Sequence, residues 1–428
     1  MISKYLSVVS KKLKNEEIKT VIINFISLSS LNLLSFIFPL LLIPYLTRTI
    51  GVEYYGEYIF SFSIFQYCLL LINFGFDYSA TKLISVNRDD KDMVSDVLTN
   101  VTVIRLIFAL LASILLWLSF IFFPNLSSNK LLYLFGFGIL WGQAITPFWL
   151  FQGVEKMGYI TIINLLTRIV STVLIFVFIR RPLDYYLINL FQSIGFLISG
   201  FASLFLINYY LKVQFSKPSF SRMKFYLLDS WHIFLSTVSM SFYREANIII
   251  LGLTTNYAMV GQYAAMEKVI KAMQSLMEPL SKALFPFFGR KLNSTAGIDP
   301  SFGRFAKIYG SLLLVLTITL YFIGPYLLIW YLGKSFQTAI IIFQVLLPVI
   351  FLGGLNYYLG IIGLINLGFN RYFLKAVFIS GVTSVSLCYF VSRFFGVIGA
   401  AIAMSTGEFV LLFLILFKIY PWIKKQTS

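Results

Sequence analysis

The sequence predicts an all-α integral membrane protein with about twelve transmembrane helices, in two six-helix lobes around a central cationic cavity. Three observations predict this fold class. Hydrophobic residues make up 59% of the 428 residues and charged residues only 12%, which is far from the composition of a soluble globular chain. Apolar runs of about 20 residues, long enough to cross a bilayer, recur along the chain. Several charged residues nevertheless lie inside these runs, where they are expected to face a polar lumen.

Apolar periodicity and the breaks between runs define twelve predicted spans. They cover residues 21–46, 57–76, 98–123, 131–151, 160–179, 184–211, 231–253, 257–287, 307–332, 338–367, 373–393 and 396–418. The first run follows a lysine-rich arm of about twenty residues. It is too long for the core of a cleaved signal peptide and lacks a small-residue cleavage site, so we interpret it as a retained first span.

The distribution of Lys and Arg predicts the orientation of these spans. With the N-terminus in the cytoplasm, 22 of the 34 basic residues fall on the cytoplasmic side, 6 on the far side and 6 within spans. Short cytoplasmic loops carry the excess of positive charge in membrane proteins. Both termini are therefore expected in the cytoplasm. The net charge of +17 follows from this topology and does not indicate nucleic-acid binding.

The two lobes are predicted from the position of a long connection and from weak internal repeats. The connection at residues 212–230 leaves six spans on either side, which predicts lobes at residues 1–214 and 215–428. Gly56-Glu57-Tyr58 at the start of the second span is echoed by Gly261-Gln262-Tyr263 at the start of the eighth, 205 residues later. Internal repeats around a central site are a recurrent transporter architecture.

Charged residues inside the spans are the candidate functional residues. A cation at the centre of a spanning helix costs roughly 2.5 to 3.5 kcal/mol on insertion scales, so it normally faces a bundle interior or a water-filled cavity. The six in-span cations are Arg105, Arg168, Arg244, Lys268, Lys271 and Lys282, and the four carboxylates are Glu245, Glu267, Glu278 and Glu408. The balance of six minus four, or +2, favours an anionic ligand.

Structural alternatives remain open for these charges. Glu267 and Lys271, like Glu278 and Lys282, are four residues apart with Glu first, so each pair could simply neutralise itself on one helical face. Arg244 and Glu245 are adjacent and point about 100° apart, so they cannot serve one partner. Arg105 and Arg168 could instead reach the cytoplasmic headgroups.

Prolines within the apolar runs predict bent helices. They are Pro39, Pro44, Pro147, Pro279, Pro286, Pro325 and Pro348. Each removes a backbone hydrogen bond and can kink its helix. Bends of this kind could open one side of a bundle, although proline is also common in static membrane helices.

Enzymatic, metal and cofactor chemistry finds no support in the sequence. His232 is the single histidine, so a histidine-based metal site or catalytic triad cannot be assembled. Cys68 and Cys388 both lie in apolar runs and are expected to pack as small apolar residues. Gly333-Lys334-Ser335 lacks the first glycine of a phosphate-binding loop, because position 328 is Leu328. We expect a protein that is not an enzyme and needs no cofactor.

Motifs along nearly the whole chain resemble one family of transporters. The first is Pro44-Tyr45-Leu46-Thr47-Arg48 with Gly75-Phe76-Asp77, the second Phe148-Trp149-Leu150-Phe151-Gln152-Gly153, and the third Val260-Gly261-Gln262-Tyr263 with Glu267-Lys268. These motifs resemble the Wzx-type O-antigen and capsular polysaccharide flippases, in the polysaccharide transport branch of the MOP exporter superfamily. The resemblance implies two six-helix lobes around a cavity, in the bacterial inner membrane.

The resemblance also implies a substrate and a mechanism. Members move an undecaprenyl-pyrophosphate-linked oligosaccharide from the cytoplasmic to the outer leaflet by alternating access, with coupling to a proton or sodium gradient expected. Membrane lipids and other polysaccharide assembly proteins are the further expected partners. A pyrophosphate needs cationic donors. We therefore assign substrate binding to Arg244, Lys271, Arg168, Lys268, Arg105 and Arg48, and ion coupling to Glu245, Glu408 and Asp77.

Two rival functions are weighed against this one. A multidrug exporter of the same superfamily would bind organic cations and would need an acidic lumen, which the +2 balance disfavours. A membrane-embedded glycan polymerase or ligase would need a sizeable outer loop for its catalytic residues, and the predicted outer loops are short.

Overall fold

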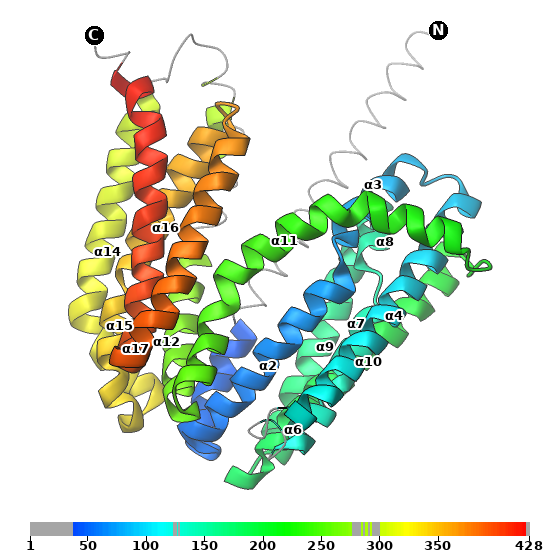
Figure 1. The fold of residues 1–428 in the computed structure, drawn as a ribbon, viewed down its shortest axis with the longest axis horizontal. Helices are drawn as coiled ribbons and strands as arrows, with labels where there is room; N and C mark the ends of the chain where they lie inside the picture. Colours follow the sequence, from blue (N-terminus) through cyan, green and yellow to red (C-terminus); the bar gives the residue numbers. More distant parts are fainter. Residues whose placement is uncertain are drawn as a thin grey trace, which may run out of the picture. The chain divides into compact units, whose positions relative to one another are not determined.

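A computed structural model describes residues 37–122, 126, 129–275, 284–285, 287–289, 292 and 300–424 of the chain; side chains at 239–245, 300 and 421–424 are outside this description. Every regular element within these residues is helical (Figure 1). A first helix occupies Ile37–Thr49. The others are α2 (Gly51–Asn73), α3 (Phe76–Val86), α4 (Lys91–Phe122), α6 (Lys130–Leu134), α7 (Phe137–Ala144), α8 (Phe148–Gly153), α9 (Met157–Phe178), α10 (Leu187–Leu206), α11 (Phe220–Thr254), α12 (Tyr257–Ser275), α14 (Pro300–Leu332), α15 (Ile340–Leu346), α16 (Pro348–Asn356) and α17 (Asn370–Lys424).

Contacts divide the chain into two compact units. The first unit contains Phe65–Ile179 and Tyr186–Thr237, and the second contains Pro39–Ile64, Arg180–Tyr185 and the chain from Val238 onward. Helices α2 and α11 each contribute one part to each unit. The lobe boundary at residue 214 stays a prediction.

The first unit is built on α4, α7, α9 and α10, which run side by side (Figure 1). The short helices α3 and α8 pack against each other at one end of this group. A core of large apolar side chains fills that end, and it includes Phe76, Trp149, Phe151 and Tyr226. Trp149 and Phe151 lie on α8, so the predicted motif around them forms part of the core.

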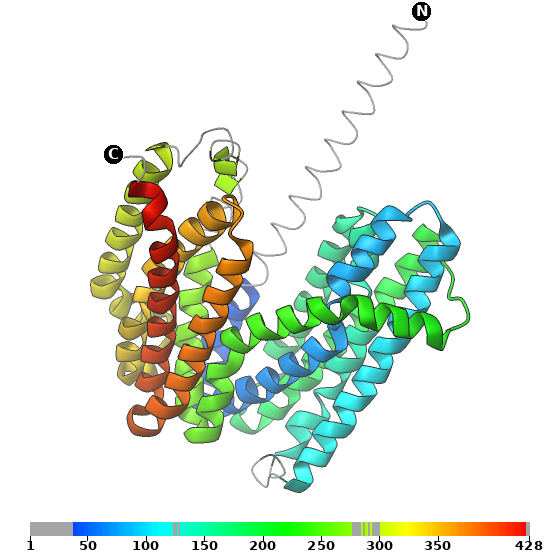
Figure 2. The ribbon, with the colours of Figure 1, turned by 45° about the horizontal axis from the view of Figure 1, so that its top comes forward.

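The second unit packs α12 against α15, α16 and α17. Helices α14 and α16 are also neighbours, and the bundle can be followed in Figure 2. A nine-residue π-helix, η4 (Tyr357–Ile365), continues α16. Helix α17 contains a kink at Gly396, whose φ of 52° lies in the left-handed region that glycine adopts without penalty. This kink separates the two last predicted spans.

The predicted membrane spans match the helices. Eight helical segments in the described part of the chain are long and apolar enough to cross a membrane, and the segment Asn370–Tyr420 holds two predicted spans because of its kink. The predicted spans at 231–253 and 257–287 fall on α11 and α12, which are helical but are not among these eight segments, and the span at 21–46 is described from residue 37. Residues 21–36 of the span at 21–46, and residues 276–283 and 286 of the span at 257–287, are outside the described residues. The all-α membrane fold is thereby confirmed.

The repeated Gly-x-Tyr motif marks a close helix crossing in the second unit. A Cβ atom on Gly56 of α2 would lie 1.8 Å from the Tyr257 carbonyl oxygen, and one on Gly261 of α12 would lie 2.2 Å from the Val52 carbonyl oxygen. Only glycine permits backbones to approach so closely. The same Cβ atoms would lie 2.6 Å from the Gly261 nitrogen and 3.0 Å from the Gly56 nitrogen, respectively, so the glycines of the two motif copies pack on each other.

Candidate functional site

Arg105 of α4 is a fully buried cation that joins two broken helices of the first unit. Its guanidinium donates to the carbonyl oxygens of Thr146 at 2.8 Å and Gln143 at 2.6 Å, and to Asn73 Oδ1 at 3.0 Å. Asn73 is the last residue of α2, Gln143 lies in the last turn of α7, and Thr146 follows two residues after that helix ends. Arg105 thus contacts both helix ends at once.

Pro147 explains why the Gln143 carbonyl group lacks its usual helical donor. In a continuous helix the carbonyl of Gln143 would accept the amide hydrogen of residue 147, but proline has none. Helix α7 ends at Ala144, and α8 begins after Pro147. The predicted break at this proline is confirmed. Arg105 supplies part of the hydrogen bonding that the break removes, as buried carbonyl groups require.

Asp77 and Arg105, two predicted site residues, both belong to the first unit. Asp77 lies half-buried in the first turn of α3. Its carboxylate interacts electrostatically with the Arg105 guanidinium. The two groups form no salt bridge in the described part of the chain, so the ion-coupling role of Asp77 stays a prediction.

Arg168 of α9 is in a different situation. Its side chain is half-buried and makes no hydrogen bond or ion pair with any residue that the structure describes. Helix α9 is one of the segments long and apolar enough to cross a membrane. A cation at such a position normally finds an anionic or carbonyl partner. Arg168 therefore has five donor hydrogens that an anionic ligand could use.

Four residues of α12 and one of α11 form a polar cluster in the second unit, which we call the α12 cluster: Tyr263, Glu267, Lys268 and Lys271 of α12, and Asn247 of α11. Glu267 is only 2% exposed and forms an ion pair with Lys271 at 3.2 Å. Tyr263 donates toward Glu267 Oε1 over 3.5 Å and accepts from Asn247 Nδ2 at 3.1 Å. The predicted pairing four residues apart is confirmed for Glu267 and Lys271, while Glu278 and Lys282 lie outside the described residues.

Lys268 belongs to the same cluster but approaches α2. Its ammonium lies 6.0 Å from the centre of the Tyr55 ring, in cation–π geometry. The Tyr55 hydroxyl is buried and has no hydrogen-bond partner in the described residues. The two predicted cations Lys268 and Lys271 are therefore both near polar groups of the second unit.

Glu408 of α17 lies in a second polar group of this unit. Asn356 Nδ2 donates to Glu408 Oε2 at 2.7 Å and to the Glu408 carbonyl oxygen at 2.9 Å. A Cβ on Gly353 would lie 2.3 Å from Gln274 Nε2 and 3.6 Å from Glu408 Oε2, so Gln274 reaches the same place from α12. The Oδ1 atom of Asn356 is buried and accepts no hydrogen bond in the described residues. Three helices thus converge with carboxylate and amide groups next to η4.

Arg48 is exposed and caps a helix. Its Nη2 donates to the carbonyl oxygens of Tyr331 at 2.9 Å and Trp330 at 3.3 Å, in the last turn of α14. Basic groups interact favourably with the C-terminal end of a helix.

The remaining predicted site residues, Arg244 and Glu245, lie on α11 with their side chains outside the described residues. Their substrate-binding and ion-coupling roles stay predictions.

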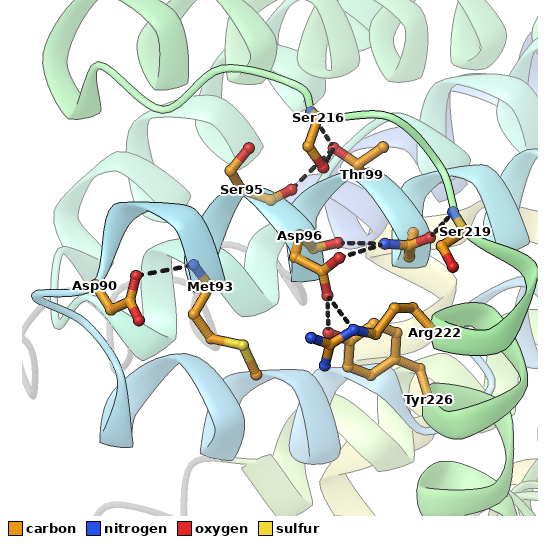
Figure 3. Close-up of polar contacts among 10 residues, drawn as sticks. Asp90, Met93, Ser95, Asp96, Thr99, Ser216, Ser219, Arg222 and Tyr226 are labelled. Carbon is orange, nitrogen blue, oxygen red and sulfur yellow. Dashed lines mark hydrogen bonds and ion pairs between the residues drawn. The ribbon is translucent and has the colours of Figure 1, made fainter.

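A third polar group fixes the 212–219 connection to the start of α4, and we call it the linker contact (Figure 3). Asp96 Oδ2 accepts from the Tyr226 hydroxyl and forms an ion pair with Arg222 Nε at 3.8 Å. Asn100 Oδ1 accepts from the Ser219 amide at 2.8 Å. Burial, followed by the hydrogen bond to Asp96, raises the pKa of Tyr226, so the phenol stays protonated and donates at neutral pH.

Two further hydrogen bonds complete the linker contact. Thr99 Oγ1 accepts from the Ser216 amide at 2.7 Å, and Ser95 Oγ donates to the Gln214 carbonyl oxygen. The linker contact therefore satisfies backbone groups of an irregular segment with polar side chains from successive turns of one helix.

The charge pattern did not reveal several of these polar residues. Gln274, Asn356 and Asn247 are uncharged, and Asp96 lies before the predicted span at 98–123. Amides inside apolar runs were the signal that could have identified the first three, because a buried amide needs partners. The partners themselves are distant in sequence and could not be predicted.

A family model described as polysaccharide biosynthesis protein matches residues 21–291 of the chain. A protein of Escherichia coli (strain K12) named "Putative O-antigen transporter" is 27% identical over 380 residues, which cover 87% of this chain and 90% of that protein. A protein of Shigella dysenteriae with the same name is 27% identical over 312 residues, covering 71% and 76%.

Solved structures show the same fold at low sequence identity. An inward-facing multidrug resistance MATE family transporter of the MOP superfamily has a TM-score of 0.69 and 15% identity, covering 92% of this chain and 99% of its own. Lipid II flippase MurJ in an inward closed conformation has a TM-score of 0.68 and 14% identity, covering 94% and 87%. These similarities establish the fold of MOP-superfamily transporters.

Proposed function

Because the chain belongs to the polysaccharide biosynthesis protein family, we propose that it is a flippase for an undecaprenyl-pyrophosphate-linked oligosaccharide, an O-antigen or capsule repeat unit. The substrate moves from the cytoplasmic to the outer leaflet of the bacterial inner membrane by alternating access of two lobes, at residues 1–214 and 215–428. Both termini lie in the cytoplasm. The two relatives named as O-antigen transporters support this substrate class.

The observation that carries the proposal is the half-buried Arg168, which has no hydrogen-bond or ion-pair partner among the described residues. A cation in a membrane-spanning helix is costly unless it serves a ligand or a pathway. A pyrophosphate offers several charged acceptor oxygens to a guanidinium fork. In the proposed mechanism Arg168 binds the pyrophosphate or an acidic sugar while the lipid tail stays in the bilayer.

The observations that support substrate binding differ among the other predicted cationic residues. Lys271 and Lys268 of the α12 cluster are held near Glu267 and Tyr55, so each can reorient toward an anion at the expense of its present contact. Arg244 is proposed from its position in the predicted span. Arg105 and Arg48 already donate to carbonyl groups, and their role in substrate binding stays a prediction.

Ion coupling is proposed at Glu408, with Glu245 and Asp77 as further candidates. The Glu408 carboxylate and the Oδ1 atom of Asn356, which accepts no hydrogen bond from the residues described, are oxygen donors beside the π-helix η4. Such oxygens suit a hard cation such as sodium, and the carboxylate could alternatively take a proton. Binding of either ion at Glu408 would neutralise a charge that is otherwise half-buried in the bundle.

Deletion of the gene in its own bacterium tests the proposed function. The expected result is loss of surface polysaccharide together with accumulation of lipid-linked repeat units on the cytoplasmic side, both reversed by the intact gene. The control is an unrelated membrane protein of equal size, expressed in the deletion strain from the same promoter, which should not reverse either change.

Normal surface polysaccharide with increased sensitivity to organic cations would contradict the proposal and favour a multidrug exporter. Accumulation of single repeat units on the outer leaflet would instead indicate a defect in polymerisation.

A further inference from the structure

The first turns of α11 carry three faces of different character. Met223, Tyr226, Leu227 and Ser230 are spaced by three, one and three residues and are buried or half-buried. Residues spaced by three or four lie on one side of a helix. This side packs against the first unit, where Tyr226 joins the linker contact and the apolar core.

A second face is exposed and largely apolar. It consists of Phe220, Lys224, Leu228, Trp231 and Leu235, spaced by four, four, three and four residues. Phe220 is 80% exposed and Leu228 is 64% exposed. Large apolar side chains arranged in one exposed stripe indicate a contact surface.

The third face is exposed and mainly polar. It consists of Ser221, Phe225, Asp229, His232 and Ser236, with the same spacing and shifted by one residue. Phe225 is its only apolar member. One helix thus presents a protein-facing, an apolar and a polar side, which is the arrangement of a helix that lies at a membrane surface.

The length of α11 supports this location. Its 35 residues span about 52 Å at 1.5 Å per residue, whereas about 20 residues are enough to cross the hydrocarbon core. The surplus of the helix lies at its start, because the apolar run begins near Trp231. The linker contact holds this start beside the first turns of α4, where Lys91, Asp92 and Asp96 make the chain polar.

The charge of the segment indicates which lipids it fits. Residues 212–236 contain Lys212, Lys217, Arg222 and Lys224 but only Asp229 as an acid, a balance of four minus one, or +3. Lys212, Lys217 and Lys224 are exposed. Basic residues near a membrane surface are attracted to anionic headgroups by roughly 1 kcal/mol each.

We propose that the first turns of α11, residues 220–230, form an interfacial helix that binds anionic phospholipids of the adjacent leaflet, the cytoplasmic one in the predicted topology, and that Trp231 and Leu235 continue its apolar side into the predicted span at 231–253. The stripe of Phe220, Leu228, Trp231 and Leu235 contacts acyl chains. Lys224, within this stripe, extends along it and binds a lipid phosphate, as does Lys217. This interaction needs no carbohydrate and is therefore independent of the proposed transport function.

Spin labels at two adjacent positions test this geometry. Cys68 and Cys388 are replaced by Ala, and a single Cys is introduced as Leu228→Cys or Asp229→Cys in the full chain, reconstituted in vesicles. Collision rates with oxygen, which partitions into lipid, and with a water-soluble nickel complex are then measured by electron paramagnetic resonance. The label at 228 is expected to favour oxygen several-fold more than the label at 229.

The charge contribution is tested in phosphatidylcholine vesicles with increasing phosphatidylglycerol. The oxygen preference at 228 is expected to increase with phosphatidylglycerol, and the double change Lys217→Gln and Lys224→Gln is expected to abolish this increase. Lys334→Gln, at an exposed lysine in the second unit, should leave it unchanged.

Equal accessibility of both labels to nickel would place the helix in water and overturn the proposal. Equal preference of both for oxygen would place the helix inside the bilayer, and a response to phosphatidylglycerol that the lysine changes do not alter would overturn the charge contribution. Surface polysaccharide export, measured separately, reports on the proposed function and not on this inference.

Discussion

Arg105 and Arg168 are both arginines of membrane-spanning helices in the first unit, yet their surroundings differ. Arg105 is fully buried and donates to two carbonyl oxygens and an amide oxygen. Arg168 is half-buried and has no such partner among the described residues. A charged residue inside a membrane protein can therefore either stabilise the fold or be available to bind a ligand. The hydrogen-bond partners of the residue distinguish the two roles. Lys271 is intermediate, because it pairs with Glu267 on its own helix.

The comparison predicts the largest loss of stability for Arg105→Ala. Removal of the guanidinium leaves the carbonyl groups of Gln143 and Thr146 without their charged donor, and we expect a cost of roughly 3 kcal/mol or more. Arg105→Lys should not restore stability, because one ammonium cannot reach three acceptors in the fork geometry. Thermal unfolding in detergent and the protein level in membranes measure the effect. Wild-type unfolding of Arg105→Ala would contradict the structural role.

A smaller loss is expected for Lys271→Met. This change leaves the buried Glu267 carboxylate without its ion-pair partner, and we expect a cost of about 2 kcal/mol, limited because Lys271 is partly exposed. The double change Lys271→Met with Glu267→Gln should recover much of it. A double-mutant cycle on thermal unfolding gives the coupling. Additive costs of the two single changes would show that the pair contributes nothing.

Glu408→Gln should change stability still less. Glutamine keeps an oxygen that accepts from Asn356, so we expect a change within about 1 kcal/mol. Transport should nevertheless lose its dependence on the ion gradient, because a neutral amide cannot take up a proton and binds sodium weakly. Translocation into vesicles with and without an imposed proton or sodium gradient measures this. Retained gradient dependence would exclude Glu408 as the coupling group and leave Asp77 and Glu245.

Arg168→Ala should have the smallest effect on stability and a clear effect on export. Since Arg168 has no partner to lose in the described residues, unfolding should be unchanged, whereas polysaccharide export should fall about tenfold, equivalent to about 1.4 kcal/mol. Arg168→Lys should retain part of the export. Lys156→Ala, at the exposed start of the same helix, is the matched control. If Arg168→Ala instead lowered stability and export in proportion, Arg168 would have a structural role like that of Arg105, which would contradict the prediction.

The sequence predicted the helical spans well because bilayer thickness imposes their length. The runs at 131–151 and 160–179 correspond closely to the segments Lys130–Gly153 and Met157–Phe178. The sequence predicted helix ends less well where helices extend beyond the bilayer. Helix α11 begins at Phe220 and not near 231, because its first turns pack on the first unit through Tyr226. A hydropathy pattern does not contain such contacts.

The candidate site could be predicted only where partners are close in sequence. Glu267 and Lys271 were paired from their spacing of four residues, and the structure confirms the ion pair. The partners of Arg105 are more than thirty residues away and depend on where α2 and α7 end. Asn356 and Gln274 were not predicted as site residues, because the prediction used charge within a span and these two side chains are neutral.

The crossing of Gly56 and Gly261 has a consequence for how such a chain can evolve. Each glycine leaves room for main-chain atoms contributed by the other copy of the motif. Shortening a neighbouring side chain does not remove main-chain atoms, so a side chain at either position requires the two helices to move apart. Exchange of one half of the gene between relatives should therefore preserve this contact whenever both parents carry the two glycines, however far their remaining residues have diverged.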